Sequence, residues 1–245
     1  MHSVRTLITA ALLPAALLAQ DLPKGADLVA KHNAAAGGRA AWEKHSSIHL
    51  VGTFGIAAMG LEGAMHVYRA KPALSYTDMQ LGAMGSVQNG FDGTTAWAID
   101  PQRGALLLEG KDRDAAALAA DFFSDVKDAS KFKSIETQAV VDFEGRKVYK
   151  VLLTRPDSIQ ATVYFDVETG LEAGMTVESD TPMGKTSVTS ILSDYKDFGG
   201  IKIATKRVQR LPQFDVVNTF TAVEFDAVPA TVFALPDAIN ALIKK

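Results

Sequence analysis

The pattern of apolar residues changes from helical to alternating near residue 48. The alanine-rich stretch Lys24–Ala36 is followed by Gly37-Gly38, which is typical of a helix that ends at a glycine. A second, short helix is expected over 39–44. From Ile48 to Ile56 alternate residues are apolar, and this period of two predicts a strand.

Most of the chain beyond this point also predicts strands, separated by glycine, proline and asparagine. Asn89-Gly90 and Asp92-Gly93 are read as turns. The later connectors, such as Glu144-Gly145, are short, which makes neighbouring strands antiparallel. The predicted strands are Ile48–Ile56, Gly63–Arg69, Leu74–Leu81, Thr94–Ile99, Ala105–Glu109, Ile135–Phe143, Arg146–Thr154, Ile159–Val167, Leu171–Glu178, Lys185–Tyr195, Ile201–Arg210 and Phe214–Phe225.

About a dozen strands are too many for a flat open sheet, so the sheet must curl, split or close. The composition shows no break that would mark a second domain. The sequence therefore predicts a mainly β (α+β) protein, with one large, curved, antiparallel sheet in a single domain over 20–245. A short helix is expected within Pro236–Lys245.

One amphipathic helix is expected to interrupt the strands, over Asp112–Ala129. Its apolar side chains follow the helical spacing and form a stripe: Ala115, Leu118, Ala119, Phe122, Phe123 and Val126. Because strands precede and follow this helix, its stripe should pack on the sheet.

The N-terminal residues predict export. Met1–Arg5 is short and positively charged, Leu7–Leu18 is apolar but short for a membrane span, and Ala19 is a small residue suited to cleavage. We expect residues 1–19 to be a signal peptide and the protein to be periplasmic. An uncleaved N-terminal anchor is the alternative.

Composition excludes several classes of function. The 245 residues contain no cysteine, so acylation at a cysteine, disulfides and thiolate metal sites are excluded. The net charge is −3 without clusters of basic residues, which argues against nucleic acid as a partner. No second apolar run reaches membrane-spanning length, so stable membrane insertion is not expected.

No motif predicts catalysis, a metal or a cofactor. His45 and His49 are four residues apart, but a strand begins between them, so the rings need not share a face. Three S-x-x-K matches occur without their partner motifs, and G-x-S-x-G is absent. A Ser–His–Asp site assembled from distant positions is the alternative that sequence alone leaves open.

Apolar and aromatic side chains are the remaining candidates for a binding site. They form either an ordinary core or an adaptable surface for an apolar ligand. The residues expected to contact such a ligand are Phe54, Ile56, Tyr68, Tyr76, Trp97, Leu118, Phe122 and Phe123. A shift of one residue in strand register would reverse the faces of those on strands.

The order of several segments resembles the Lol-type lipoprotein carrier superfamily, the periplasmic proteins that sort outer-membrane lipoproteins. The resemblance is carried by Glu144–Val151, Tyr164–Leu171, Ser193–Ile201 and Phe225–Pro236, with Ala34–Arg39 similar to exported relatives. It implies an incomplete β-barrel whose open side is covered by helices and whose apolar concavity holds acyl chains. This chain is longer than such carriers, and no basic residue can be matched to the one they use near the covering helices.

Three functions follow as expectations. The first is a non-enzymatic periplasmic carrier for the acyl chains of a lipid or lipoprotein. The second is an interaction module whose sheet face or edge binds another envelope protein. The third is a hydrolase, which would require serine, histidine and carboxylate side chains to converge.

Overall fold

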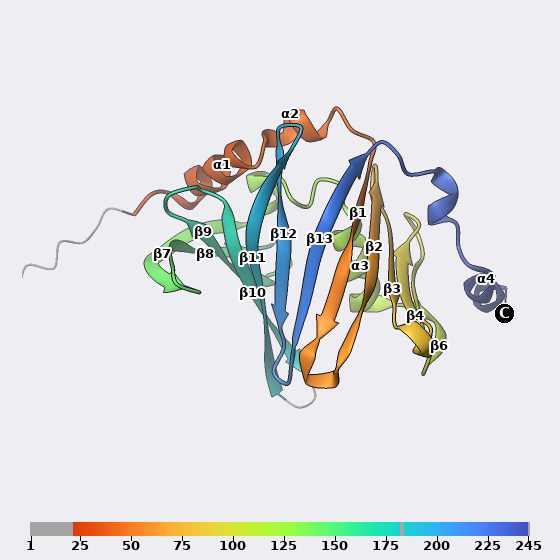
Figure 1. Cartoon of the computed structure of the whole chain (residues 1–245). Coiled ribbons are helices and arrows are strands. Elements are labelled where there is room, and N and C mark those ends of the chain that lie inside the picture. Colours follow the sequence, from red (N-terminus) through yellow and green to blue (C-terminus); the bar gives the residue numbers. More distant parts are fainter. Residues whose placement is uncertain (1–21, 182–183, 245) are drawn as a thin grey trace, which may run out of the picture.

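The computed structural model describes residues 22–181 and 184–244, which form helices at both ends of the chain and, between them, two series of strands separated by a further helix (Figure 1). The expected signal peptide, residues 1–19, lies outside the described residues. The helices are α1 (Gly25–Ala35), α2 (Gly38–Trp42), α3 (Gly110–Ala120) and α4 (Asp237–Ile243), with 3-10 turns η1 (Ala57–Met59), η2 (Gly82–Met84), η3 (Ala129–Lys131) and η4 (Ala230–Phe233).

The strands form one 13-stranded antiparallel sheet in the order β6-β5-β4-β3-β2-β1-β13-β12-β11-β10-β9-β8-β7. Their bounds are β1 (Ser47–Ile56), β2 (Leu61–Ala70), β3 (Leu74–Gln80), β4 (Ser86–Phe91), β5 (Ala96–Asp100), β6 (Gly104–Leu108), β7 (Ser134–Phe143), β8 (Arg146–Thr154), β9 (Gln160–Asp166), β10 (Glu172–Thr181), β11 (Gly184–Phe198), β12 (Ile201–Arg210) and β13 (Asp215–Phe225).

The sheet curves strongly but does not close, because β6 and β7 stand at its two ends and do not pair with each other (Figure 1). Pairing of β1 with β13 joins the first half of the chain to the second. The expectation of a mainly β protein with an incomplete barrel and a few covering helices is confirmed.

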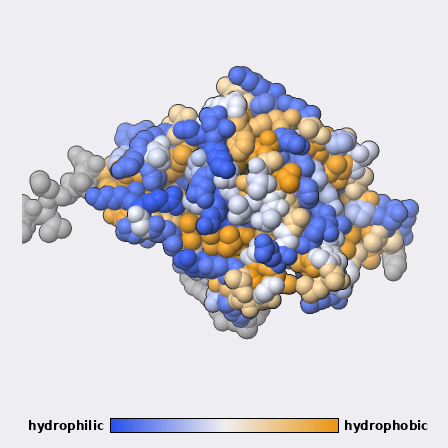
Figure 2. Space-filling view, in the orientation of Figure 1, coloured by the Kyte–Doolittle hydropathy of each residue, from blue (hydrophilic) through white to orange (hydrophobic). Residues whose placement is uncertain are grey.

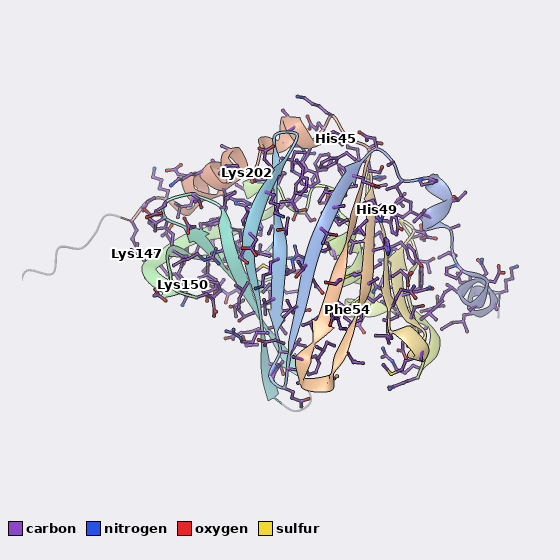
Figure 3. The ribbon with its side chains drawn as sticks, in the orientation of Figure 1. His45, His49, Phe54, Lys147, Lys150 and Lys202 are labelled. Atoms are coloured by element: carbon purple, nitrogen blue, oxygen red, sulfur yellow. The ribbon has the colours of Figure 1, made fainter. Side chains whose placement is uncertain are left out.

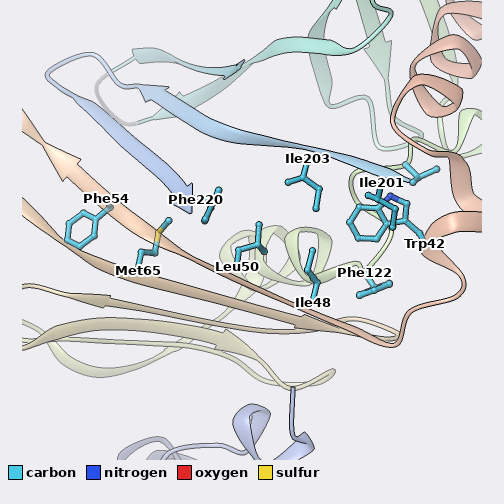
Figure 4. Packing of buried hydrophobic residues seen from close by; sticks show 10 residues of the cluster. Trp42, Ile48, Leu50, Phe54, Met65, Phe122, Ile201, Ile203 and Phe220 are labelled. Atoms are coloured by element: carbon cyan, nitrogen blue, oxygen red, sulfur yellow. The ribbon is translucent and has the colours of Figure 1, made fainter. Parts of the chain in front are cut away.

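The two faces of the sheet differ in what they bury. The inner face carries Ile48, Leu50 and Phe54 of β1, whose side chains are at most 4% exposed. They belong to a cluster that runs along the strands from Trp42 and Phe122 at one end to Phe54 and Met65 at the other (Figure 4). The outer face carries the alternate residues of β1, among them His49.

Three helices pack on the inner face. Leu28 and Val29 of α1 lie against β8 and β9, Trp42 of α2 joins the central cluster, and Ala120 of α3 packs beside Phe91. In the described ranges, no helix combines the length and the apolar character needed to cross a bilayer.

The helix expected over Asp112–Ala129 is shorter in the structure, and this prediction was wrong at its C-terminal end. α3 ends at Ala120, and the Asp121 side chain accepts a hydrogen bond from the Phe123 backbone N–H at 2.9 Å. Such a local bond competes with helical hydrogen bonding. The apolar stripe is therefore divided: Leu118 is 54% exposed on the helix, whereas Phe122 is buried beyond it.

The turn expected at Asn89-Gly90 is wrong as well, because both residues lie inside strand β4. Gly90 pairs with Trp97 of β5, and a Cβ at position 90 would come within 2.8 Å of the indole ring. Here the glycine provides space for an aromatic ring rather than a turn.

The C-terminal segment follows the outer side of the first half of the sheet. η4 contacts β3 and α4 contacts β6, and the segment runs beside these strands in Figure 1. Ile239 of α4 is fully buried, and Trp97, on the outer face of β5, is 2% exposed. The expected C-terminal helix is confirmed as α4.

Gly52 lies at a bulge where the backbones of β1 and β13 come close together. Replacing Gly52 tests whether this close approach needs a glycine. A Cβ at this position would collide with the backbone carbonyl oxygen of Thr219. We expect Gly52→Ala to lower the free energy of unfolding by about 1–3 kcal/mol in urea denaturation. Gly55→Ala in the same strand is the control, because its Cβ would meet only an ordinary contact at 3.8 Å. Equal effects of the two substitutions would contradict this view of the bulge.

Candidate functional site

The segment that follows α3, residues 121–128, fills the middle of the inner face and is called the plug below. Phe122 is fully buried, and its ring meets the Trp42 ring edge-on at 5.5 Å and 81°. Val126 is 7% exposed in the same cluster. The Phe122 backbone N–H donates to the Pro72 carbonyl oxygen at 3.3 Å. The plug thus places apolar side chains on the sheet without being a helix.

A charged contact fixes the centre of the plug to β2. The two terminal nitrogens of Arg69 donate to Asp125 and to the Ser124 hydroxyl, each at 2.7 Å. Partial removal from water would by itself raise the pKa of the Asp125 carboxyl. The positive charges of Arg69, then Arg207 and Lys127, outweigh this and hold the pKa at about 2. Asp125 is therefore a carboxylate at neutral pH.

A second charged contact fixes the end of the plug to α1 and β10. Lys127 forms an ion pair with Glu172 at 2.7 Å, and the two side chains are only 13% and 10% exposed. Asn33 of α1 donates to the Lys127 carbonyl oxygen at 2.7 Å and accepts from its backbone N–H at 2.9 Å. The plug is therefore attached through polar groups at its centre and end, and through Phe122 and Val126 to the apolar sheet.

The residues expected to contact a ligand do not share one face. Phe54, Phe122 and Phe123 belong to or pack against the inner cluster, and Ile56 has the strand phase of Phe54. Leu118 is exposed on α3. By strand register, three of the eight lie on the outer face: Tyr68, Tyr76 and Trp97.

The outer-face aromatic residues form a row across neighbouring strands. His49 stacks on Tyr68 at 4.2 Å, and the row continues through Tyr76 to Trp97. His49 also contacts His66 at 3.0 Å between ring nitrogens. Figure 3 shows His49 with His45 near the end of the sheet where β1 begins. In the described part of the chain no group of three or more potential metal ligands is assembled.

Two hollows lie on the outer face along β13. The larger, about 740 Å³, has Ile191, Val208 and Val217 on its floor and Glu144 and Arg210 at its rim. The smaller, about 310 Å³, reaches from Val217 to the β1–β2 connection. In Figure 2 apolar patches alternate with hydrophilic residues over this side of the molecule. The hollows have mixed polarity, unlike the inner face.

One set of serine, histidine and carboxylate side chains does converge, where α2 leads into β1. Asp226 accepts from the Ser46 hydroxyl at 2.9 Å and contacts the His45 ring nitrogen at 2.7 Å. The Ser46 backbone N–H, followed by His45, holds the pKa of the Asp226 carboxyl below its usual range. The serine faces the carboxylate and not the histidine, so the histidine cannot act as its base. This arrangement ties the end of β13 to the start of β1.

The charged residues that hold the plug were not found from the sequence. Arg69 alternates with the same period as Met65 and Val67, so it lies on their face of the strand. A charged residue at an apolar position of the pattern was the sequence signal that could have indicated its role. Asp125 lies within the range where the periodicity predicts a helix, but α3 ends before it. Lys127 and Glu172 are 45 positions apart in sequence, and only the fold brings them together.

No protein-family model and no curated protein sequence matches this chain. Solved structures do. A DUF1329 family protein from Desulfovibrio piger matches with a TM-score of 0.61 and 11% identity, over 86% of this chain and 95% of that one. A LolA superfamily protein from Nitrosomonas europaea matches with a TM-score of 0.56 and 10% identity, over 87% and 99% of the two chains.

A third structure, described as an outer membrane lipoprotein-sorting protein domain from Vibrio parahaemolyticus, matches with a TM-score of 0.55 and 10% identity, over 89% of this chain and 97% of that one. At such low identity these likenesses concern the fold. The chain shares the fold of these three proteins, which is the fold that its resemblance implied.

Proposed function

We propose that this protein is a periplasmic, non-enzymatic carrier that binds an acyl chain of a lipid or lipoprotein on the inner face of its sheet. Residues 1–19 would be removed on export, leaving 20–245 as a single domain that is not lipidated. The Lol-type fold supports the carrier class. The observation that carries the proposal is the plug, an irregular segment that lays Phe122 and Val126 on the site where the chain would bind.

The proposed binding exchanges one set of apolar contacts for another. Displacing Phe122 costs about 3–5 kcal/mol, taking its truncation as a guide. Each buried methylene returns about 0.8 kcal/mol, so an acyl chain with about ten buried methylenes returns about 8 kcal/mol. On these figures about four to six methylenes only offset the displacement of Phe122, and the freedom lost on association adds to that cost, so we expect affinity to rise with chain length.

The proposed contacts come from the inner-face members of the predicted set. Phe54 and Ile56 would line the far end of the acyl-chain site, and Phe122 and Phe123 would move with the plug. Leu118 on α3 is exposed and free to cover the chain. The outer-face residues Tyr68, Tyr76 and Trp97 are not part of this site.

The test is binding of a long alkyl chain by the protein purified from the periplasm of a bacterial host and stripped of lipid. Native mass spectrometry with chains of eight to eighteen carbons should give complexes whose abundance rises with chain length. Phe122→Ala weakens the plug and should tighten binding by about a hundredfold or more, because the ~3–5 kcal/mol that displacing Phe122 would cost is no longer spent. Ile159→Ala is the matched control, because the Ile159 side chain is 50% exposed, and this substitution should leave binding unchanged. A protein that binds no chain of any length would contradict the proposal.

An envelope protein partner is the second candidate, and the larger outer-face hollow favours it. Its apolar floor is bordered by the ion pair between Arg210 and Glu144 at 2.8 Å, a polar rim around an apolar centre. Lys206 lines this hollow, so crosslinking from Lys206 in the envelope would capture such a partner. The acyl-chain carrier proposed first would not require a protein partner at this hollow.

A further inference from the structure

Arg69 is an unusual residue for the inner face of an apolar sheet. It pairs across strands with Ile48, lies near the Trp42 ring at 6.0 Å, and is 12% exposed. Its two terminal nitrogens use Asp125 and Ser124 as acceptors, and both acceptors belong to the plug. Its Nε atom is buried and has no hydrogen-bond partner within residues 22–181 and 184–244.

Displacement of the plug would remove both acceptors from Arg69 at once. A guanidinium left in apolar surroundings without an anion is strongly unfavourable. A neutral acyl ligand offers nothing to restore the pairing. A carboxylate or phosphate does, because the planar guanidinium binds such groups through two parallel hydrogen bonds.

A second arginine contributes positive charge from across the sheet. Arg207 of β12 lies on the inner face, in register with Asn218, which in turn faces Phe54. Its charge acts on Asp125, and its side chain is exposed. Asp125 is itself 38% exposed. An anionic group in the position of the Asp125 carboxylate would therefore contact the Arg69 guanidinium, be attracted by the charge of Arg207, and remain accessible.

We propose that the ligand is an anionic amphiphile, and that Asp125 occupies the position that the ligand's carboxylate or phosphate takes when the plug is displaced. This inference rests on the proposed function. It adds that Arg69, with Arg207, selects the head group, while the apolar inner face binds the chain. Asp125 then serves as an internal competitor for the same cationic site.

The test compares head groups on one chain length. Hexadecanoate, hexadecyl phosphate and hexadecanol are titrated, each below its aggregation concentration, into a Trp97→Phe background. The emission of Trp42, which contacts Phe122 of the plug, then reports displacement. We expect at least one anionic probe to bind about tenfold to hundredfold more tightly than hexadecanol. The stronger of the two anions identifies a carboxylate or a phosphate source.

Two variants make the test specific to the arginine. Asp125→Asn removes the internal competitor and should tighten binding of the anionic probe while leaving hexadecanol nearly unchanged. Arg69→Gln combined with Asp125→Asn removes the pair together, so no unpaired charge remains, and should abolish most of the preference for the anion. Urea denaturation confirms that each variant is folded; if the double variant is not, the response of Asp125→Asn decides alone.

The outcomes separate this inference from the proposed function. Equal affinity for hexadecanol and both anions would overturn the head-group assignment and leave the carrier proposal standing. Tight anion binding that Asp125→Asn does not alter would also overturn it, since the head group would then lie elsewhere. Failure of all three probes to bind would contradict the carrier proposal itself.

Discussion

Replacing Phe122 by alanine is expected to lower the free energy of unfolding by about 3–5 kcal/mol. The side chain is fully buried between Trp42 and the β-sheet, and its ring also meets Phe123 edge-on at 5.5 Å. Truncation would leave a cavity in the middle of the inner face, which the curved sheet cannot close. Urea denaturation followed by circular dichroism measures the loss.

The exposed Ile159→Ala should change the free energy of unfolding by no more than about 0.5 kcal/mol, which makes it the stability control as well. A loss below about 1 kcal/mol for Phe122→Ala would show that the plug spends much of its time off the sheet. The stability and binding results for this one variant are linked. A plug that contributes to stability must compete with the ligand, so the variant should be less stable and bind the chain more tightly.

Replacing Lys127 by methionine is expected to cost about 3–5 kcal/mol of folding free energy, because it leaves the Glu172 carboxylate buried without its partner. The double variant Lys127→Met with Glu172→Met removes both charges and should recover most of the loss. The hydrogen bonds between the Asn33 side-chain amide and the backbone of residue 127 do not depend on the side chain at position 127 and should persist. Urea denaturation of the two single variants and the double variant gives the coupling between the residues.

A surface ion pair is the comparison for this cycle. Arg155 and Asp157 are 2.8 Å apart but 38% and 46% exposed, so Arg155→Met should cost less than about 1 kcal/mol. If Lys127→Met were equally mild, the pair with Glu172 would be solvated in solution and the end of the plug would not be firmly attached.

The end and the centre of the plug are attached to the rest of the protein by different kinds of contact. The Lys127 end is attached to β10 by an ion pair and to α1 by two hydrogen bonds between its backbone and the Asn33 side chain, whereas the centre is attached to Arg69 through side chains alone. An anionic ligand can replace Asp125 at Arg69, but it offers no substitute for Lys127. We therefore expect the segment around Phe122 to move and the segment around Lys127 to stay.

The sequence by itself determined the class of fold. Period-two patterns located the long strands correctly, because a strand with one buried face must alternate, and the glycine after Ala36 marked the end of α1. It also indicated an apolar segment in mid-chain that packs on the sheet. The resemblance of several turn segments to Lol-type carriers named the fold, since turns depend on local residues.

Only the tertiary structure decided which side each residue faces and which charges meet. Tyr68 and Phe54 are both aromatic residues on predicted strands, but strand register places them on opposite faces of the sheet. Asp121 ended the helix that periodicity would have continued to Ala129, so Phe122 reached the core from an irregular segment. Arg69 and Asp125 are 56 positions apart, and no local pattern could pair them. Their contact exists because the curved sheet brings β2 beneath the segment after α3, where a charge in apolar surroundings must have a partner.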